Sequence, residues 1–134
     1  MQNTHERILV ADDEKYLVTS IKLWLKSHGY DAAAALNGEM ALEKILESNT
    51  KDTSYDLLIL DIQMPVMNGL ELIDRLKRLH ISIPVLVITG YGDRKLLMEL
   101  LKRRCNDYLD KPFNEELLLS KVQLILKREK KLTS

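Results

Sequence analysis

Cysteine is almost absent from this chain: Cys105 is the only one in 134 residues. A single cysteine excludes an internal disulfide and suits a reducing compartment. The chain also lacks an excess of charge, because 20 Lys and Arg residues balance 20 Asp and Glu residues. We therefore expect no general attraction to nucleic acid, and no direct contact with it by this domain.

Long apolar runs are missing as well. No stretch approaches the roughly 18 uninterrupted apolar residues that a membrane span needs, so no membrane association is expected. Residues 1–7 are polar and lack the apolar run of a signal peptide. The chain also has no internal repeat and no low-complexity segment. These features together favour a cytoplasmic location.

Hydrophobic residues are plentiful by comparison. They make up 46% of the chain, enough for a globular core. The length suits one domain with one core, and we expect that domain to occupy residues 1–134. Within it, the core should span about residues 7–127, with 128–134 as a helix end or the start of a linker.

Short apolar runs alternate with longer segments of helical periodicity. The runs predict strands at residues 8–11, 31–36, 57–60, 84–88 and 107–110. The segments between them predict helices at about 17–28, 39–47, 70–79, 94–101 and 115–130. Asp93 and Asn114 are expected to cap the last two helices, and the polar residues 48–55 to form a loop.

Five strands alternating with five helices predict an α/β fold with a parallel sheet covered on both faces. Right-handed crossovers favour a flavodoxin-like, doubly wound (βα)5 three-layer sandwich with strand order 2-1-3-4-5. Ligands of such sheets bind beyond the carboxyl ends of the strands, near the point where the strand order reverses. Functional residues are therefore expected at the strand ends.

Polar side chains stand at the ends of four predicted strands: Asp12 and Asp13, then Asp61, Thr89 and Lys111. Singly, each has an ordinary explanation, such as a helix cap or a solvated charge. Carboxylates about 4 Å apart, however, repel by about 4 kcal/mol at an effective dielectric of 20. A hard cation such as Mg²⁺ would offset that repulsion.

A carboxylate beside Mg²⁺ and an ammonium can act as a nucleophile toward an activated phosphoryl group. The metal and Lys111 would then neutralise the oxygens of the group in transfer. A hydroxyl such as that of Thr89 can donate a hydrogen bond to a third oxygen. The set of residues therefore predicts the formation of an aspartyl phosphate.

The chain resembles the receiver domains of two-component response regulators. The segments that carry the resemblance are ILVADDE at 8–14, DLLILDIQMPVMNG at 56–69, PVLVITG at 84–90 and DYLDKPF at 107–113. Their order and spacing match the family from about Arg7 to Lys127. The resemblance implies a phosphorylation-controlled signalling switch rather than a conventional enzyme, one that takes part in its own phosphorylation and dephosphorylation.

The resemblance also assigns roles at the strand ends. It implies that Asp61 accepts a phosphoryl group from a sensor histidine kinase or a phosphotransfer protein. Asp13 and Asp61 would bind Mg²⁺ directly with the backbone carbonyl of Gln63, and Asp12 would act through water. Lys111 would pair with the phosphoryl group, and its peptide bond to the following proline is expected to be cis.

Thr89 and Tyr108 are similar to the family's switch pair. Thr89 would move toward the phosphoryl oxygen while the Tyr108 ring turns into the space released. The surface of the fourth helix, fifth strand and fifth helix would then present the output to a downstream effector domain or protein. Gln63 and Tyr91 lie where the family tunes the access of hydrolytic water.

Two features depart from the family or extend it. Arg104 and Cys105 replace a small Gly-Ala pair before the fifth strand, where Cys105 can fill a small buried role. The apolar band of the last helix is wider than one core face needs. It predicts either a phosphorylation-dependent homodimer or partner surface, or simple partial exposure of a few leucines.

Other functions fit the sequence less well than the phosphorylated switch does. The main alternative is a phosphorylation-independent protein-interaction domain, or pseudo-receiver, which would be expected to lack one of the strand-end residues. A small Mg²⁺-dependent phosphatase would need extra segments to enclose its substrate. A P-loop NTPase is disfavoured because no glycine-rich loop ending in Gly-Lys-Ser/Thr is present.

Overall fold

The computed structural model describes residues 6–90, 93–103 and 105–133; the expectations for Tyr91 and Arg104 lie outside these residues. Strands and helices alternate along the chain. They are β1 (Arg7–Ala11), α1 (Lys15–Ser27), β2 (Asp31–Ala35), α2 (Gly38–Thr50), β3 (Leu57–Asp61), α3 (Gly69–Arg78), β4 (Val85–Thr89), α4 (Arg94–Lys102), β5 (Asp107–Asp110) and α5 (Glu115–Thr133).

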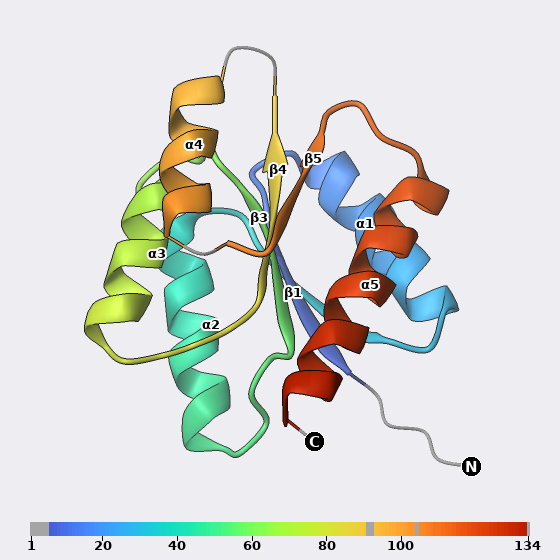
Figure 1. Cartoon of the computed structure of the whole chain (residues 1–134), viewed down its shortest axis with the longest axis horizontal. Helices are drawn as coiled ribbons and strands as arrows, with labels where there is room; N and C mark the ends of the chain where they lie inside the picture. The colour runs from blue at the N-terminus through green and yellow to red at the C-terminus, as the bar shows by residue number, and fades with distance from the viewer. Residues whose placement is uncertain (1–5, 91–92, 104, 134) are drawn as a thin grey trace.

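The five strands form one sheet in the order β2-β1-β3-β4-β5, and every pair of neighbours is parallel. Figure 1 shows the sheet between two helical layers, with α2, α3 and α4 on one face and α1 and α5 on the other. Helices on both faces are what a parallel sheet requires, since each crossover places its helix on one side. The predicted doubly wound α/β fold is confirmed.

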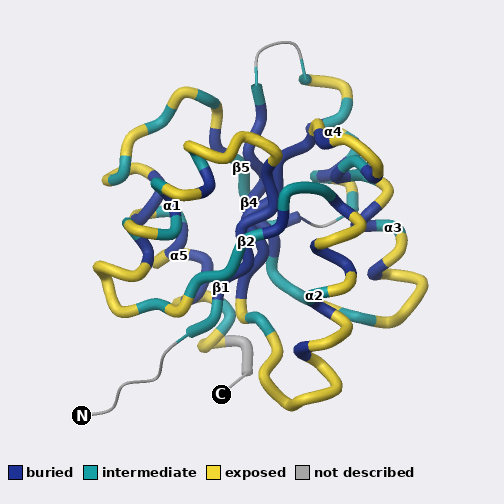
Figure 2. The backbone as a smooth tube through the Cα atoms, turned by 180° about the vertical axis from the view of Figure 1, so that it is seen from behind, coloured by how far each residue is buried: buried dark blue, intermediate teal, exposed yellow. Residues whose placement is uncertain are grey.

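The core lies on both faces of the central strands. Every residue of β3 and β4 is buried, and these strands run through the dark interior of the tube in Figure 2. Successive residues of β3 point to opposite faces, so Leu58 and Leu60 pack with α2, α3 and α4. Leu57 and Ile59 pack with α1 and α5 instead. This explains why the continuous apolar runs in the sequence form central strands.

The loop predicted at 48–55 begins later than expected, because α2 continues to Thr50. The polar residues at its end are satisfied inside the helix: the Ser48 hydroxyl donates to the Ile45 carbonyl at 2.9 Å. In the same way, the Thr50 hydroxyl donates to the Glu47 carbonyl at 2.8 Å. Polarity alone therefore misplaced this boundary. The last helix also runs to Thr133, beyond the predicted end.

The two predicted caps behave differently. Asn114 caps α5 as expected, since its side-chain oxygen accepts a hydrogen bond from the Leu117 amide at 2.8 Å. Asp93 stands at the N-cap position of α4, but its side chain makes no capping bond, so that part of the prediction is wrong. Its carboxylate accepts hydrogen bonds from the Gln63 side chain and the Gly90 amide instead.

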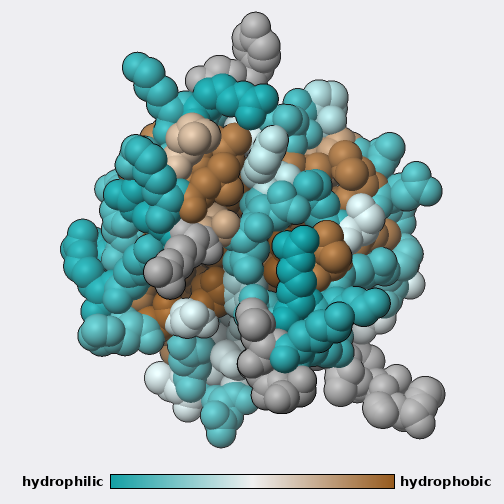
Figure 3. All heavy atoms as spheres, viewed as in Figure 1, coloured by the Kyte–Doolittle hydropathy of each residue, from teal (hydrophilic) through white to brown (hydrophobic). Residues whose placement is uncertain are grey.

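The apolar band of α5 is mostly absorbed by the core. Five of its apolar side chains are buried: Leu118, Leu119, Val122, Ile125 and Leu126. Leu117 and Leu124 are each 45% exposed. On the face seen in Figure 3, hydrophobic areas are separated by hydrophilic side chains. None of the helices in the described part of the chain combines the length and the hydropathy of a transmembrane segment.

Candidate functional site

Three carboxylates meet at the carboxyl edge of the sheet. β1 and β3 are parallel neighbours with Ala11 opposite Leu60, so the residues that follow, Asp12 and Asp61, come side by side. Asp12 is fully buried, Asp61 is 5% exposed, and Asp13 is exposed. One oxygen from each of Asp12, Asp13 and Asp61 lies within 4.8 Å of the others. The structure thus brings together the acidic residues that the sequence singled out.

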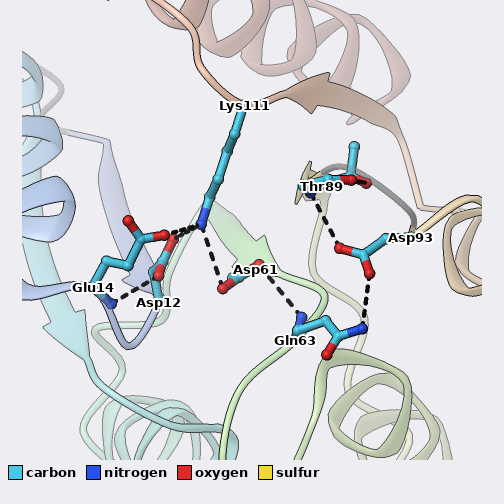
Figure 4. Close-up of polar contacts among 8 residues, drawn as sticks. Asp12, Glu14, Asp61, Gln63, Thr89, Asp93 and Lys111 are labelled. Carbon is cyan, nitrogen blue, oxygen red and sulfur yellow. Dashed lines mark hydrogen bonds and ion pairs between the residues drawn. The ribbon is translucent and has the colours of Figure 1, made fainter.

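Lys111 reaches this cluster from the segment after β5, where its peptide bond to Pro112 is cis, as predicted. Its ammonium nitrogen lies 2.7 Å from Glu14 Oε1, 3.1 Å from Asp12 Oδ2 and 3.6 Å from Asp61 Oδ2. Figure 4 shows the lysine side chain extending from the end of β5 into the space between these carboxylates. One ammonium therefore serves three carboxylates.

The electrostatics of the cluster are unbalanced. Burial, and next the charge of Asp12, raise the pKa of Asp61 to about 7, although Lys111 opposes the change. Burial also raises the pKa of Asp12, against the hydrogen bond from the Glu14 amide and the charge of Lys111. Burial lowers the pKa of Lys111, but its hydrogen bond to Glu14 and the charges of Asp61 and Asp12 outweigh burial, so the net change is upward. The ionised carboxylates need more positive charge than Lys111 provides.

The segment after β3 folds back closely over Asp61. A methyl group at Gly69 would lie 3.1 Å from the Asp61 carbonyl oxygen, tighter than most real contacts, which explains the glycine. The Gln63 amide points at Asp61 Oδ1 across a long 3.4 Å contact. The Gln63 side chain donates to Asp93 Oδ1 at 2.8 Å, so the segments after β3 and β4 are joined beside the cluster (Figure 4).

A capping box fixes the end of this segment. The Asn68 side chain accepts from the Glu71 amide at 2.9 Å, and the Glu71 side chain accepts from the Asn68 amide at 3.2 Å. Such a reciprocal pair satisfies two amides that the first turn of a helix leaves unpaired. The start of α3 is therefore defined, and with it the path of the chain between Asp61 and Gly69.

The two predicted switch residues lie on β4 and β5. Thr89 ends β4, is 2% exposed, and donates its hydroxyl hydrogen to the Gly90 carbonyl at 3.2 Å. Tyr108 is half-buried against the layer of α2, α3 and α4. The Lys121 ammonium lies 5.8 Å from the centre of the Tyr108 ring. Thr89 is therefore buried and hydrogen-bonded to the backbone, whereas Tyr108 is half-buried with an ammonium group near its ring.

The carboxylate cluster fits a divalent metal ion. Asp12 Oδ2 is buried and has no partner in hydrogen-bond geometry among the described residues, although the Lys111 ammonium is near it. Hard oxygen donors grouped this closely are the ligand set that Mg²⁺ takes up. A dication would also favour the ionised form of Asp61, whose pKa is raised. Asp12, Asp13 and Asp61 would hold the ion, Asp12 through water.

Two residues beside the cluster make contacts that the sequence did not predict. Glu14 is the closest partner of Lys111, and Asp93 joins Gln63 to Gly90. The position of Glu14 directly after two aspartates at a strand end was a signal for its role. Nothing in the sequence indicated the contact of Asp93, because its position before a helix favours capping.

Comparison of the chain with known proteins identifies its family. The family model described as the response regulator receiver domain matches residues 8–123 of the chain. The chain belongs to this family. Transcriptional regulatory protein CpxR of Escherichia coli (strain K12) is 37% identical to this receiver domain over 125 residues, which are 91% of this chain and 50% of CpxR.

Solved receiver domains have the same fold. The signal receiver domain of a putative Luxo repressor protein from Vibrio parahaemolyticus is 30% identical, with a TM-score of 0.84 over 94% of this chain and 93% of that one. A CheY-like receiver domain protein from Methanospirillum hungatei JF-1 is 28% identical, with a TM-score of 0.85 over 96% and 98%. The chain spans about half the length of CpxR.

Proposed function

We propose that this receiver domain is a phosphorylation switch in which Asp61 accepts the phosphoryl group. The observation that carries the proposal is the buried carboxylate of Asp61, set at the end of β3 with two more carboxylates and the Lys111 ammonium around it. The phosphodonor would be a sensor histidine kinase or a phosphotransfer protein. We also propose a cytoplasmic location, in line with the single cysteine of the chain.

The chemistry follows from these positions. An ionised Asp61 oxygen attacks the phosphorus, and the bond between phosphorus and the donor's nitrogen breaks as the new phosphorus–oxygen bond forms. Lys111 donates hydrogen bonds to the oxygens of the phosphoryl group, which carry most of the charge during transfer. Mg²⁺ bound directly by Asp13, Asp61 and the Gln63 carbonyl, and through water by Asp12, would supply the remaining positive charge.

The output would begin at Thr89. Its hydroxyl now donates to the Gly90 carbonyl, and a phosphoryl oxygen on Asp61 offers a charged acceptor, which is stronger. If Thr89 exchanges partners, the half-buried Tyr108 ring gains space to turn inward. The exchange would shift the population between two packings of α4, β5 and α5, and a downstream effector domain or protein would bind that surface.

The direct test is incubation with Mg²⁺ and a small acyl phosphate, followed by intact mass measurement. Wild-type protein should gain one phosphoryl group, and Asp61→Asn should gain none. The matched control Glu43→Gln removes an exposed carboxylate from α2 and should behave as wild type. The proposal would be contradicted if wild-type protein neither gained a phosphoryl group nor bound beryllofluoride. It would also be contradicted if Asp61→Asn gained the same adduct as wild type.

The protein-interaction alternative predicts a different result. A phosphorylation-independent domain would bind its partner equally well with and without beryllofluoride. The full set of strand-end residues is present, and Asp12, Asp13, Asp61 and Lys111 lie together in space, which favours the phosphorylated switch instead. Sedimentation with and without beryllofluoride tests the homodimer version, in which the exposed Leu117 and Leu124 of α5 would contribute to the contact.

A further inference from the structure

The Lys111 ammonium has three hydrogens to donate and three carboxylates around it. Its closest contact, 2.7 Å, is to Glu14 rather than to Asp61. Glu14 is the N-cap residue of α1 but makes no side-chain capping bond there, so its carboxylate is turned to Lys111 instead (Figure 4). A phosphoryl group on Asp61 would add oxygens that compete for the same three hydrogens.

The cost of moving the Lys111 ammonium away differs among the three carboxylates. Asp12 is fully buried, and Asp12 Oδ2 has no hydrogen-bond partner among the described residues, so moving the ammonium away would leave a buried charge unpaired. Asp61 carries the phosphoryl group itself. The Glu14 side chain is 59% exposed, so water can replace the ammonium at small cost. Glu14 is therefore the partner that Lys111 can exchange.

We propose that Glu14 is a positioning residue that competes with the phosphoryl group for Lys111 and thereby sets how tightly the site holds that group. The inference rests on the proposed function, because it concerns the same lysine and the same phosphoryl oxygens. A strong pair with Glu14 weakens phosphoryl binding, and loss of the pair frees one donor. Glu14 also repels the phosphoryl anion, and this acts in the same direction.

The effect of Glu14 on a metal ion has the opposite sign. A carboxylate near a cation site attracts the cation, so removing its charge cannot tighten Mg²⁺ binding. Neutralising Glu14 should therefore raise the affinity for an anionic phosphoryl mimic while the affinity for Mg²⁺ falls or stays the same. Damage to the fold would lower both affinities. Tighter beryllofluoride binding without tighter Mg²⁺ binding therefore distinguishes competition for Lys111 from a structural role.

The test compares wild type with Glu14→Gln and with the charge-matched control Glu43→Gln, which lies on α2. Beryllofluoride affinity is measured at saturating Mg²⁺, and Mg²⁺ affinity is measured separately. Because a half-exposed ion pair contributes modestly, Glu14→Gln should bind beryllofluoride roughly twofold to fivefold more tightly. Glu43→Gln should match wild type in both measurements.

A spectroscopic signature is measured on the same three proteins without beryllofluoride. NMR of the labelled lysine side chains should show faster exchange of the Lys111 ammonium hydrogens with water in Glu14→Gln than in wild type or Glu43→Gln. Unchanged exchange would overturn the inference, whatever the binding results.

The binding results separate the inference from the function. If wild type binds beryllofluoride and Glu14→Gln binds it no more tightly, the role of Glu14 is wrong and the switch stands. If Glu14→Gln binds both beryllofluoride and Mg²⁺ more tightly, general relief of strain replaces competition, and the inference fails. If wild type binds no beryllofluoride, both the proposed function and the inference fall.

Discussion

Two clusters in this molecule gather carboxylates around a basic side chain, and they differ in burial. Lys111 meets Asp12, Glu14 and Asp61 at the carboxyl edge of the sheet. Arg103 meets Asp74 at 2.7 Å and Glu99 at 3.0 Å, linking α4 to α3.

The pKa values of the carboxylates move in opposite directions in the two clusters. Burial, followed by the charge of Asp12, raises the pKa of Asp61 to about 7. The hydrogen bond from Arg103, followed by the charge of Lys102, holds the pKa of the exposed Glu99 below its usual range. The fold therefore favours charge at Glu99 and opposes it at Asp61. The Arg103 cluster stabilises the surface, whereas the Lys111 cluster keeps a carboxylate ready for a cation or a phosphoryl group.

The largest expected effect comes from removing the opposed charge. Asp61→Asn should stabilise the protein by on the order of 2–4 kcal/mol at pH 8 without divalent cations. Wild-type stability should fall as the pH rises from about 4 to about 7, because folded Asp61 keeps a proton that the unfolded chain has released. Urea unfolding of both proteins from about pH 4 to about pH 8 measures both effects.

Glu43→Gln provides the control for Asp61→Asn, since it removes an exposed carboxylate and should leave the wild-type pH dependence in place. In Asp61→Asn the fall between pH 4 and 7 should largely disappear. An Asp61→Asn protein that is less stable than wild type at pH 8 would contradict the contrast between the two clusters.

Magnesium should act nearly as strongly, because it supplies the missing positive charge. Mass action predicts a gain of about 2.7 kcal/mol when the ion is present at 100 times its dissociation constant. Thermal unfolding at increasing Mg²⁺ concentration measures the gain. Asp61→Asn should show a smaller gain because one ligand has lost its charge. An equal gain in the two proteins would show that Mg²⁺ acts elsewhere.

Loss of the cation at the first cluster should be somewhat weaker in effect. Lys111→Met leaves the carboxylates unpaired, and because the lysine is partly exposed we expect a loss of about 1–3 kcal/mol at pH 8. The loss should shrink when Asp61→Asn is present as well, which a double-mutant cycle measures. Additive effects of the two substitutions would mean that Lys111 and Asp61 do not interact.

The Arg103 cluster should give the smallest effect. Arg103→Gln breaks pairs that are more exposed than those of Lys111, so its loss of stability should be below that of Lys111→Met and should decrease in high salt. Urea unfolding at low and high sodium chloride concentration tests this. A salt-independent loss as large as that of Lys111→Met would remove the distinction between the two clusters.

The fold could be predicted from the sequence because its strongest signals are local. β3 and β4 are buried on both faces, so each is a continuous apolar run in the sequence. Such a run can be recognised as a central strand without knowledge of the rest of the chain. The end of α2 could not be predicted in the same way. Ser48 can either end a helix or donate its hydroxyl to the Ile45 carbonyl within the helix. Which of the two occurs depends on how deeply Ser48 is buried, and the polar residues around it in the sequence do not indicate that.

The candidate site was predictable to the level of which residues meet, and less so to the level of how they pair. Asp12 and Asp61 follow neighbouring parallel strands, so topology alone brings them together. The pairing of Lys111 with Glu14 depends on how the segment after β5 approaches α1, across 97 positions of sequence. The turn of Asp93 toward Gln63 likewise depends on packing between two loops.

The most direct measurement locates the phosphoryl group on the chain. Borohydride reduces an aspartyl phosphate to homoserine, and peptide mass spectrometry then identifies the position. After treatment with Mg²⁺ and an acyl phosphate, wild-type protein should carry homoserine at position 61 and at no other aspartate. Homoserine at position 12 or 13 instead, or at none despite a phosphoryl adduct in the intact mass, would contradict the account.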